Sequence, residues 1–137
     1  MSKIAVVYYS MTGNTEAMAQ YVAEGVKAAG ATVATFTSDS FTAAAVADYD
    51  AIAFGCPAMG AEQLESDEFE PMFEACKPVL GTKPIALFGS YGWGTGEWMD
   101  IWAADCAGLN LVKTVICNED PDDEAAEACR QLGTALA

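Results

Sequence analysis

The chain has 137 residues, 53% of them hydrophobic, which is the size of one domain with a single buried core. Its 20 acidic and 6 basic residues give a formal net charge of −14, which argues against binding to nucleic acids or anionic membrane surfaces. With no histidine, the chain cannot form a Ser-His-Asp or Cys-His catalytic centre or a histidine-ligated metal site.

Short apolar runs alternate with helix-like stretches from one end of the chain to the other. The residue pattern predicts strands at 4–9, 32–37, 51–55, 84–89 and 111–117, and helices at 16–29, 41–47, 68–76, 97–107 and 122–136. The run at 32–37 is more polar than the others, which is typical of an edge strand. This alternation predicts one α/β domain over residues 1–137, with a parallel sheet covered by helices on both faces.

Apolar spacing also predicts which side of each helix is buried. In the first helix, Met18, Val22 and Val26 share one face. In the fourth predicted helix the apolar face is expected to carry Trp98, Ile101 and Trp102. The last helix is expected to bury Ala125, Ala128, Cys129, Leu132, Ala135 and Leu136.

The cysteines and the N-terminus indicate where the protein works. The five cysteines show no metal-binding spacing, and we expect them to be small buried thiols in a reducing compartment. The chain enters a strand-like run after Met1, Ser2 and Lys3, without the pattern of a signal peptide, and contains no apolar run long enough to span a membrane. We therefore expect a soluble cytoplasmic protein.

Parallel α/β sheets bind ligands outside the carboxyl ends of their strands, so the residues after each strand are the most informative. The first strand is followed by Ser10-Met-Thr-Gly-Asn-Thr15 and then by a helix. Hydroxyl groups, an amide and backbone N–H groups at a helix N-terminus favour a phosphate. One residue would suffice for ordinary helix capping, which is the alternative interpretation. The segment lacks the lysine of an ATP-binding P-loop and the GxGxxG pattern of a dinucleotide site.

Two other loops favour a flat aromatic ligand. The third strand is followed by Cys56-Pro-Ala-Met-Gly-Ala-Glu62, in which Met59 is suited to contact a flat apolar ring unless it is buried in a turn. The fourth strand is followed by Gly89-Ser-Tyr-Gly-Trp-Gly-Thr-Gly96. The aromatic side chains there are suited to stack on a ring, unless they fold back on the following helix. One phosphate and one flat heteroaromatic ring with a polar edge together indicate FMN.

These motifs closely resemble those of the flavodoxins, in particular the short-chain flavodoxins of clostridia and related anaerobes. The resemblance rests on residues 10–15, on Gly55-Cys-Pro-Ala-Met-Gly-Ala-Glu62 and on Phe88-Gly-Ser-Tyr-Gly-Trp-Gly-Thr-Gly-Glu-Trp98, and it covers essentially the whole chain. It implies a flavodoxin-like three-layer sandwich with a five-stranded parallel sheet of order 2-1-3-4-5. It also implies a tightly but non-covalently bound FMN.

The same resemblance implies a set of contacts to FMN. Met59 is expected on the inner face of the ring and Trp93 on the outer face, and Glu62 is expected to accept a hydrogen bond from the N3–H group. The Gly60–Ala61 peptide matches the one that turns over on reduction, although Asp or Ser is common in place of Ala61. Pro57 stands where other members have a hydroxyl. The full set of expected contacts is Ser10, Met11, Thr12, Gly13, Asn14, Thr15, Pro57, Ala58, Met59, Gly60, Ala61, Glu62, Ser90, Tyr91, Gly92, Trp93, Gly94 and Asn118.

The function that these expectations describe is one-electron transfer by a monomeric carrier, not catalysis. The negative charge around the flavin favours a strongly reducing couple between the semiquinone and the hydroquinone. Fifteen of the 20 acidic residues lie from Glu62 onward, and we expect them to steer redox partners with basic docking patches, such as ferredoxin-type reductases and oxidoreductases. A merely solvated acidic surface is the alternative.

Two other functions fit this pattern of motifs less well. A small FMN-dependent NAD(P)H quinone or nitro reductase needs space over the ring, which Trp93 would block. A phospho-acceptor signalling domain needs acidic residues after the first strand, Asp after the third strand and Lys after the fifth, where the chain has Ser10, Cys56 and Asn118 instead.

Overall fold

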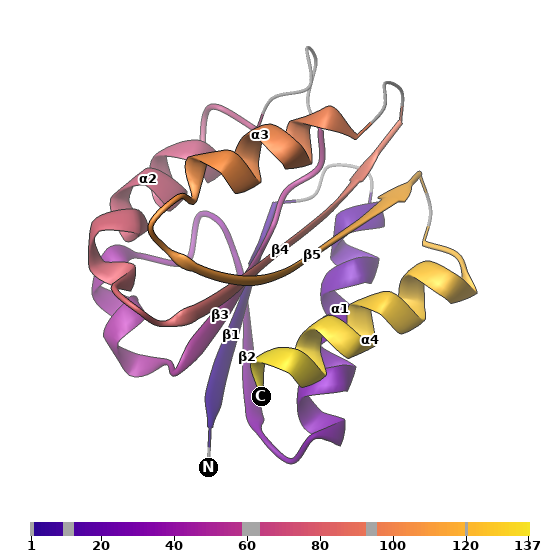
Figure 1. The fold of residues 1–137 in the computed structure, drawn as a ribbon, viewed down its shortest axis with the longest axis horizontal. Helices are drawn as coiled ribbons and strands as arrows, with labels where there is room; N and C mark the ends of the chain where they lie inside the picture. Colours follow the sequence, from indigo (N-terminus) through magenta and orange to yellow (C-terminus); the bar gives the residue numbers. More distant parts are fainter. Residues whose placement is uncertain (1, 10–12, 59–63, 93–95, 120) are drawn as a thin grey trace.

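The computed structural model of the chain describes residues 2–9, 13–58, 64–92, 96–119 and 121–137. Its elements follow one another in the order β1 (Lys3–Tyr8), α1 (Asn14–Ala28), β2 (Thr32–Thr37), the 3₁₀ helix η1 (Ala43–Asp48), β3 (Ala51–Gly55), α2 (Phe69–Leu80), β4 (Pro84–Tyr91), α3 (Glu97–Asp105), β5 (Asn110–Asn118) and α4 (Asp123–Leu136). The strands form one parallel sheet of order β2-β1-β3-β4-β5 (Figure 1), which confirms the predicted topology and the edge position of β2. Among the helices of the described residues, none has the length and apolar character needed to cross a membrane.

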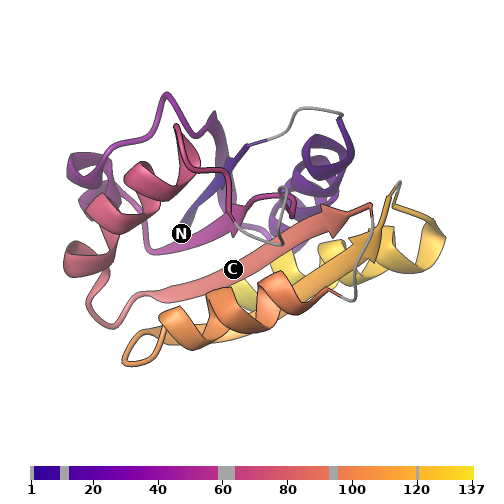
Figure 2. The ribbon, with the colours of Figure 1, turned by 90° about the horizontal axis from the view of Figure 1, so that it is seen from above.

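Alternate side chains of the buried strands face opposite layers, as the two-residue period of a strand requires. In β1, Ala5 and Val7 pack into the core under α2 and α3, whereas Ile4 and Val6 pack into the core under α1 and α4. Figure 2 shows α1 and α4 side by side at one side of the molecule and α2 at the other. Burial on both faces explains why β1 and β3 read as continuous apolar runs in the sequence.

Two predicted helices differ from the observed elements. The stretch predicted at 41–47 forms the 3₁₀ helix η1 and not an α-helix, because Val46 is its one buried residue and little packing supports it. The helix predicted at 68–76 continues to Leu80 as α2, through Pro78. The buried side chains of Cys76 and Leu80 explain this extension, since their packing compensates for the hydrogen bond that proline cannot donate.

The buried faces of two later helices were also only partly predicted. Ile101 is 61% exposed, and Met99 instead joins Trp98 and Trp102 in the core. In α4, Ala135 is exposed. The predicted Leu132 and Leu136 are buried, and Gly133, which no apolar-spacing rule would select, is buried between them. Helix rotation is decided by contacts with neighbouring elements, and these contacts depend on side-chain shape as well as on polarity.

The five cysteines are buried thiols, as predicted. Burial raises the pKa of Cys56 and of Cys129 to about 12. It raises the pKa of Cys76 and of Cys106 to about 11. These four thiols are therefore protonated at neutral pH and behave as small apolar side chains.

Helices α1 and α4 approach each other through glycine. A Cβ atom at Gly133 would collide with the main-chain oxygen of Val22, and one at Gly25 would collide with that of Arg130. The hydroxyl of Thr134 donates a hydrogen bond to the main-chain oxygen of Gly25 at 3.3 Å, which ties the two helices at this point. The position of α1, and of its N-terminus, therefore depends on the absence of a side chain at Gly25 and at Gly133.

We predict that Gly133→Ala lowers the free energy of unfolding by about 1–3 kcal/mol, because the added methyl group must push the helix backbones apart. Alanine is the better helix former by about 1 kcal/mol, so helix propensity alone would give the opposite sign. Urea denaturation measures the change, and Gln131→Ala on the exposed face of α4 is the control. If Gly133→Ala is as stable as the original protein, α1 and α4 are not in close contact at this position and the prediction is wrong.

Candidate functional site

The carboxyl ends of β1, β3 and β4 are joined by main-chain hydrogen bonds that continue beyond the strands. Tyr9 donates to Gly55 at 2.9 Å, and Cys56 donates to Phe88 at 3.1 Å. Ala58 then donates to Ser90 at 3.0 Å. Figure 1 shows the N-terminus of α1 at the same end of the molecule as the carboxyl ends of β4 and β5. We call this end of the sheet the carboxyl edge.

Helix α1 begins at the carboxyl edge with Asn14, directly after Gly13. Gly13 has a φ of 93°, a left-handed conformation that a residue with a side chain rarely adopts. The N–H groups of a first helical turn have no partners within the helix, and the helix dipole adds positive potential there. Asn14 and Thr15, both predicted site residues, form that first turn. The local geometry therefore suits an anion.

Thr15 and Ser90 form a buried pair behind the first turn of α1. Their side-chain oxygens lie 3.4 Å apart, and the residues are 1% and 4% exposed. Both residues were predicted to contact FMN directly. In the structure their hydroxyls contact each other, and the main-chain oxygen of Ser90 also accepts the hydrogen bond from Ala58. This pair connects α1, β4 and the segment after β3.

Strand β4 is longer than predicted and includes Ser90 and Tyr91, which were expected in a loop. The Tyr91 ring lies 5.5 Å from the ring of Trp98 in α3, in a tilted arrangement. This aromatic side chain thus folds back on the following helix, which was the alternative interpretation for the loop. The main-chain oxygen of Tyr91 accepts hydrogen bonds from the N–H of Glu119 at 2.8 Å and from the side chain of Asn118 at 3.3 Å.

Some of the remaining residues predicted to contact FMN lie in the described part of the chain, and the others lie outside it. Pro57 and Ala58 are half-buried beside β4, and Gly92 is exposed at the end of β4. The other predicted residues lie outside the described part of the chain: Ser10, Met11, Thr12, Met59, Gly60, Ala61, Glu62, Trp93 and Gly94.

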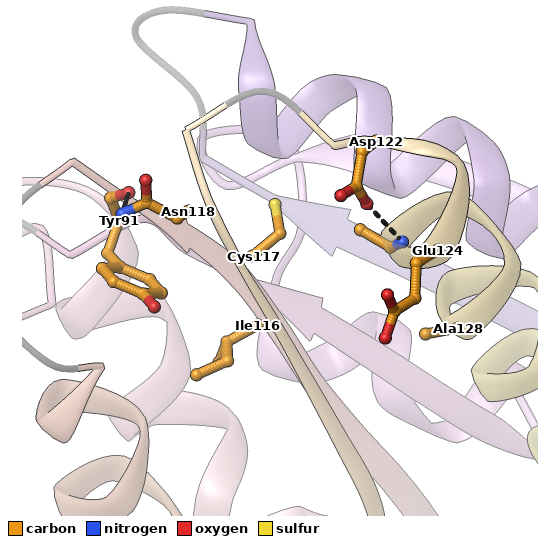
Figure 3. Close-up of a pocket in the computed structure, with 8 residues that line it drawn as sticks. Tyr91, Ile116, Cys117, Asn118, Asp122, Glu124 and Ala128 are labelled. Carbon is orange, nitrogen blue, oxygen red and sulfur yellow. Dashed lines mark hydrogen bonds between the residues drawn. The ribbon is translucent and has the colours of Figure 1, made fainter.

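Among the residues that the structure describes, two acidic pockets flank the carboxyl edge. Figure 3 shows the first, of about 340 Å³, where Tyr91 and Ile116 lie on one side of β5 and Asp122, Glu124 and Ala128 lie on the other. The second has a volume of about 330 Å³ and lies between the ends of β1 and β2. It is lined by hydroxyl groups and carboxylates that sequence reasoning did not select: Tyr8, Tyr9, Glu16, Thr37, Ser38, Asp39 and Glu68.

Sequence reasoning also missed Glu65, which is only 6% exposed. Burial by itself raises the pKa of a carboxyl group, but hydrogen bonds from three backbone N–H groups outweigh this effect and lower the pKa of Glu65. Glutamate is not a typical helix-capping residue, and the N-cap position of α2 is Glu68, so no local motif in the sequence singles out Glu65.

Comparison with known proteins places the chain in a well-defined group. Residues 6–133 match the family model described as Flavodoxin. The chain is 47% identical over 136 residues to the flavodoxin of Megasphaera elsdenii, with 98% of each chain covered. It is 38% identical over 134 residues to the flavodoxin of Clostridium beijerinckii, covering 96% of this chain and 97% of that one. The solution structure of the two-electron reduced Megasphaera elsdenii flavodoxin superimposes with a TM-score of 0.90 at 46% identity, covering 97% of both chains.

The hydroxyl pair of Thr15 and Ser90 can be tested in the protein without ligand. Removing one hydroxyl by Thr15→Val or Ser90→Ala leaves the other buried without this partner, and we expect each change to cost about 1–3 kcal/mol in the free energy of unfolding. The double variant should lose less than the sum, because it leaves no orphaned hydroxyl. Urea denaturation of all three variants measures the coupling, with Thr114→Val on an exposed position of β5 as the control. Strictly additive losses would contradict the pairing.

Proposed function

Because the chain belongs to the flavodoxin family, we propose that it carries single electrons at low potential between redox enzymes, with FMN held non-covalently at the carboxyl edge. The chain is an FMN-binding electron carrier and not an enzyme. A small NAD(P)H quinone or nitro reductase is therefore not favoured. The observation that carries the proposal is the match over nearly the whole length of two flavodoxins, together with a helix N-terminus at the carboxyl edge.

The described residues at the carboxyl edge fit the phosphate group of FMN. The first turn of α1 offers backbone N–H groups and the amide of Asn14, and the hydroxyls of Thr15 and Ser90 lie directly behind it. Helix N-termini bind phosphate with such donors even without a neighbouring cation. We assign the phosphate to residues 10–15, of which Gly13, Asn14 and Thr15 are described.

The flavin ring is assigned to the segments that follow β3 and β4. When bound, FMN supplies the one-electron chemistry, and the protein binds, orients and shields it. We propose Met59 and Trp93 as the residues on the two faces of the ring, and Glu62 as the acceptor for its N3–H group. Ala58 and Asn118 anchor the flanks of this region through their hydrogen bonds to Ser90 and Tyr91.

The charges of the described residues are arranged to favour a basic partner. Carboxylates cluster where the helices begin at the carboxyl edge, as with Glu16 in α1, Glu97 in α3 and Asp123 in α4. Lysines lie at the opposite ends of the elements, as with Lys3 at the start of β1 and Lys27 in the last turn of α1. As a flavodoxin, the chain works with redox partner proteins. We propose that these partners present basic patches to the carboxyl edge.

We also propose that the protein is a cytoplasmic monomer. The support for the cytoplasm is the set of buried thiols, since cysteines that form no disulfide are typical of reducing compartments. The support for a monomer is the net charge of −14, because two such copies repel each other.

The assigned function is tested by adding FMN to the purified protein without ligand and following the quenching of flavin fluorescence. We expect tight binding, and two separate one-electron steps when the complex is titrated with dithionite. Trp93→Ala should raise the Kd by about tenfold or more through lost stacking and ring burial, equivalent to about 1.4 kcal/mol. Ile101→Ala, an exposed apolar residue of α3, is the control. A protein that leaves FMN unbound would overturn the function, whereas an unaltered Kd for Trp93→Ala would refute only the stacking assignment.

Basic partners should be attracted over long range, so the rate of electron transfer should depend on salt. With cytochrome c as a basic redox probe, we expect the bimolecular rate to fall by about tenfold or more between low and physiological ionic strength. Asp39→Lys, next to the end of β2, should lower the rate at low salt more than Asp48→Lys, which lies before β3 at the opposite edge. Equal effects of the two charge reversals would contradict a directed approach to the carboxyl edge.

A further inference from the structure

Glu65 is the one charged side chain that is buried among the residues the structure describes. The assigned FMN contacts do not include it. Burying a carboxylate is costly unless its oxygen atoms are hydrogen-bonded, so a buried carboxylate points to a position that the fold must hold in place.

The Glu65 carboxylate accepts hydrogen bonds from the backbone just before and at the start of α2. Its Oε1 atom accepts from the N–H of Glu68 at 2.7 Å and from that of Phe69 at 2.8 Å, and its Oε2 atom accepts from Asp67 at 2.9 Å. The main-chain oxygen of Glu65 also accepts from Glu70 at 2.9 Å. The Glu65 carboxylate therefore satisfies N–H groups at the start of α2, and its negative charge lies at the positive end of the helix dipole.

Helix α2 gives Glu65 a rigid support. Phe69 is fully buried, and its ring stacks near that of Phe73 and meets the ring of Trp102 edge-on at 5.4 Å. The Glu65 carboxylate is thus bonded to the backbone of α2, whose buried side chains pack in one core with those of the sheet and of α3.

The main chain of Glu65 is also tied to the end of β3. Its N–H donates to the sulfur of Cys56 at 3.4 Å, although nine positions separate the two residues. Cys56 is held by its hydrogen bond to Phe88, and Ala58 by its hydrogen bond to Ser90. The described residues on both sides of 59–63 are therefore held, Ala58 by its bond to β4 and Glu65 by its bond to Cys56.

We propose that Glu65 is a positioning residue for the flavin ring, whose carboxylate holds the far end of the segment 57–64 against the sheet. The proposal rests on the proposed function, which assigns Met59 to Glu62 within this segment to the ring. A binding loop closed at both ends loses less conformational entropy when its ligand binds, and its contacts are held closer to the productive geometry.

The experiment compares the affinity of the purified protein for three probes, which are FMN, riboflavin and inorganic phosphate. Glu65→Ala removes all three hydrogen bonds to the carboxylate, and we expect the Kd for FMN and for riboflavin to rise by about tenfold or more. The affinity for inorganic phosphate should stay within about twofold, because that ion needs only the segment around α1. Asp50→Ala is the matched control, since Asp50 also accepts a backbone N–H, that of Lys3 at 2.8 Å, at the opposite edge of the sheet.

Glu65→Gln keeps two oxygen lone pairs but loses the charge and one acceptor atom, so its affinities should lie between those of the original protein and Glu65→Ala. If the Glu65→Ala variant does not fold, the affinities of Glu65→Gln test the proposal instead. An unchanged Kd for FMN in a folded variant would overturn the proposal. Parallel losses of FMN and phosphate affinity would also overturn it, because they would indicate a general loosening of the fold. Failure of the original protein to bind FMN would instead refute the proposed function.

The pH dependence gives a readout that needs no ligand. The pKa of Glu65 is lowered in the folded protein, so the ionised carboxylate stabilises the fold fully above its unfolded pKa, and this contribution is lost as pH falls through the lower folded pKa. The difference in unfolding free energy between the original protein and Glu65→Gln should therefore be largest near neutral pH and shrink in acid. The titratable side chains whose charges interact with Glu65 are those of Tyr9 and Cys56. Asp67, Glu68 and Glu70 are titratable neighbours in the chain that bond to Glu65 through their backbone N–H groups. A difference that does not change with pH would show that the charge itself has no role.

Discussion

The carboxyl edge depends on main-chain hydrogen bonds that continue the pairing of the sheet into its loops. Cys56 bonds to Phe88 and Ala58 bonds to Ser90 beyond the last residue of β3, so the segment after β3 leaves the sheet in a fixed direction. Backbone groups that are removed from water must be paired, and here their partners are the neighbouring strands. The positions of residues 56–58 and of the end of β4 follow from this pairing.

A second constraint is that a chain with a net charge of −14 binds an anionic cofactor. Lysine would be the simplest phosphate ligand, but the lysines lie toward the other end of the molecule, as at Lys3 and Lys27. In the site that we propose, backbone N–H groups at a helix N-terminus hold the phosphate, because they provide positive potential without a formal charge. The carboxyl edge can then remain acidic, as the proposed docking of basic partner proteins requires. Backbone dipoles would hold the cofactor and carboxylates would attract the partner, so the two proposed roles do not conflict.

The fold was largely predictable because its main determinant is local. Continuous apolar runs such as 51–55 can only be strands buried on both faces, and the alternation of strands with helices leaves few topologies. The failures have non-local causes. Ile101 fits the apolar spacing of α3 but is exposed, because Met99 fills the contact with the sheet instead. The predicted helix ended at Cys76, yet burial of Leu80 extends α2 beyond Pro78. Glu65 reads as one more acid in an acidic chain, and its burial depends on the fold of residues far from it in the sequence.

By itself, the sequence determined the order of strands and helices, the identity of the loops at the carboxyl edge and the resemblance that pointed to FMN. These properties follow from residue type and short-range spacing, which set backbone preference and the burial of alternate side chains. Only the tertiary structure decided that Thr15 faces Ser90, that Tyr91 folds onto Trp98 and that the main chain of Glu65 bonds to the sulfur of Cys56. Each of these contacts joins residues from different elements of the fold. Whether the residues meet depends on packing distances of a few ångströms, which no local sequence pattern encodes.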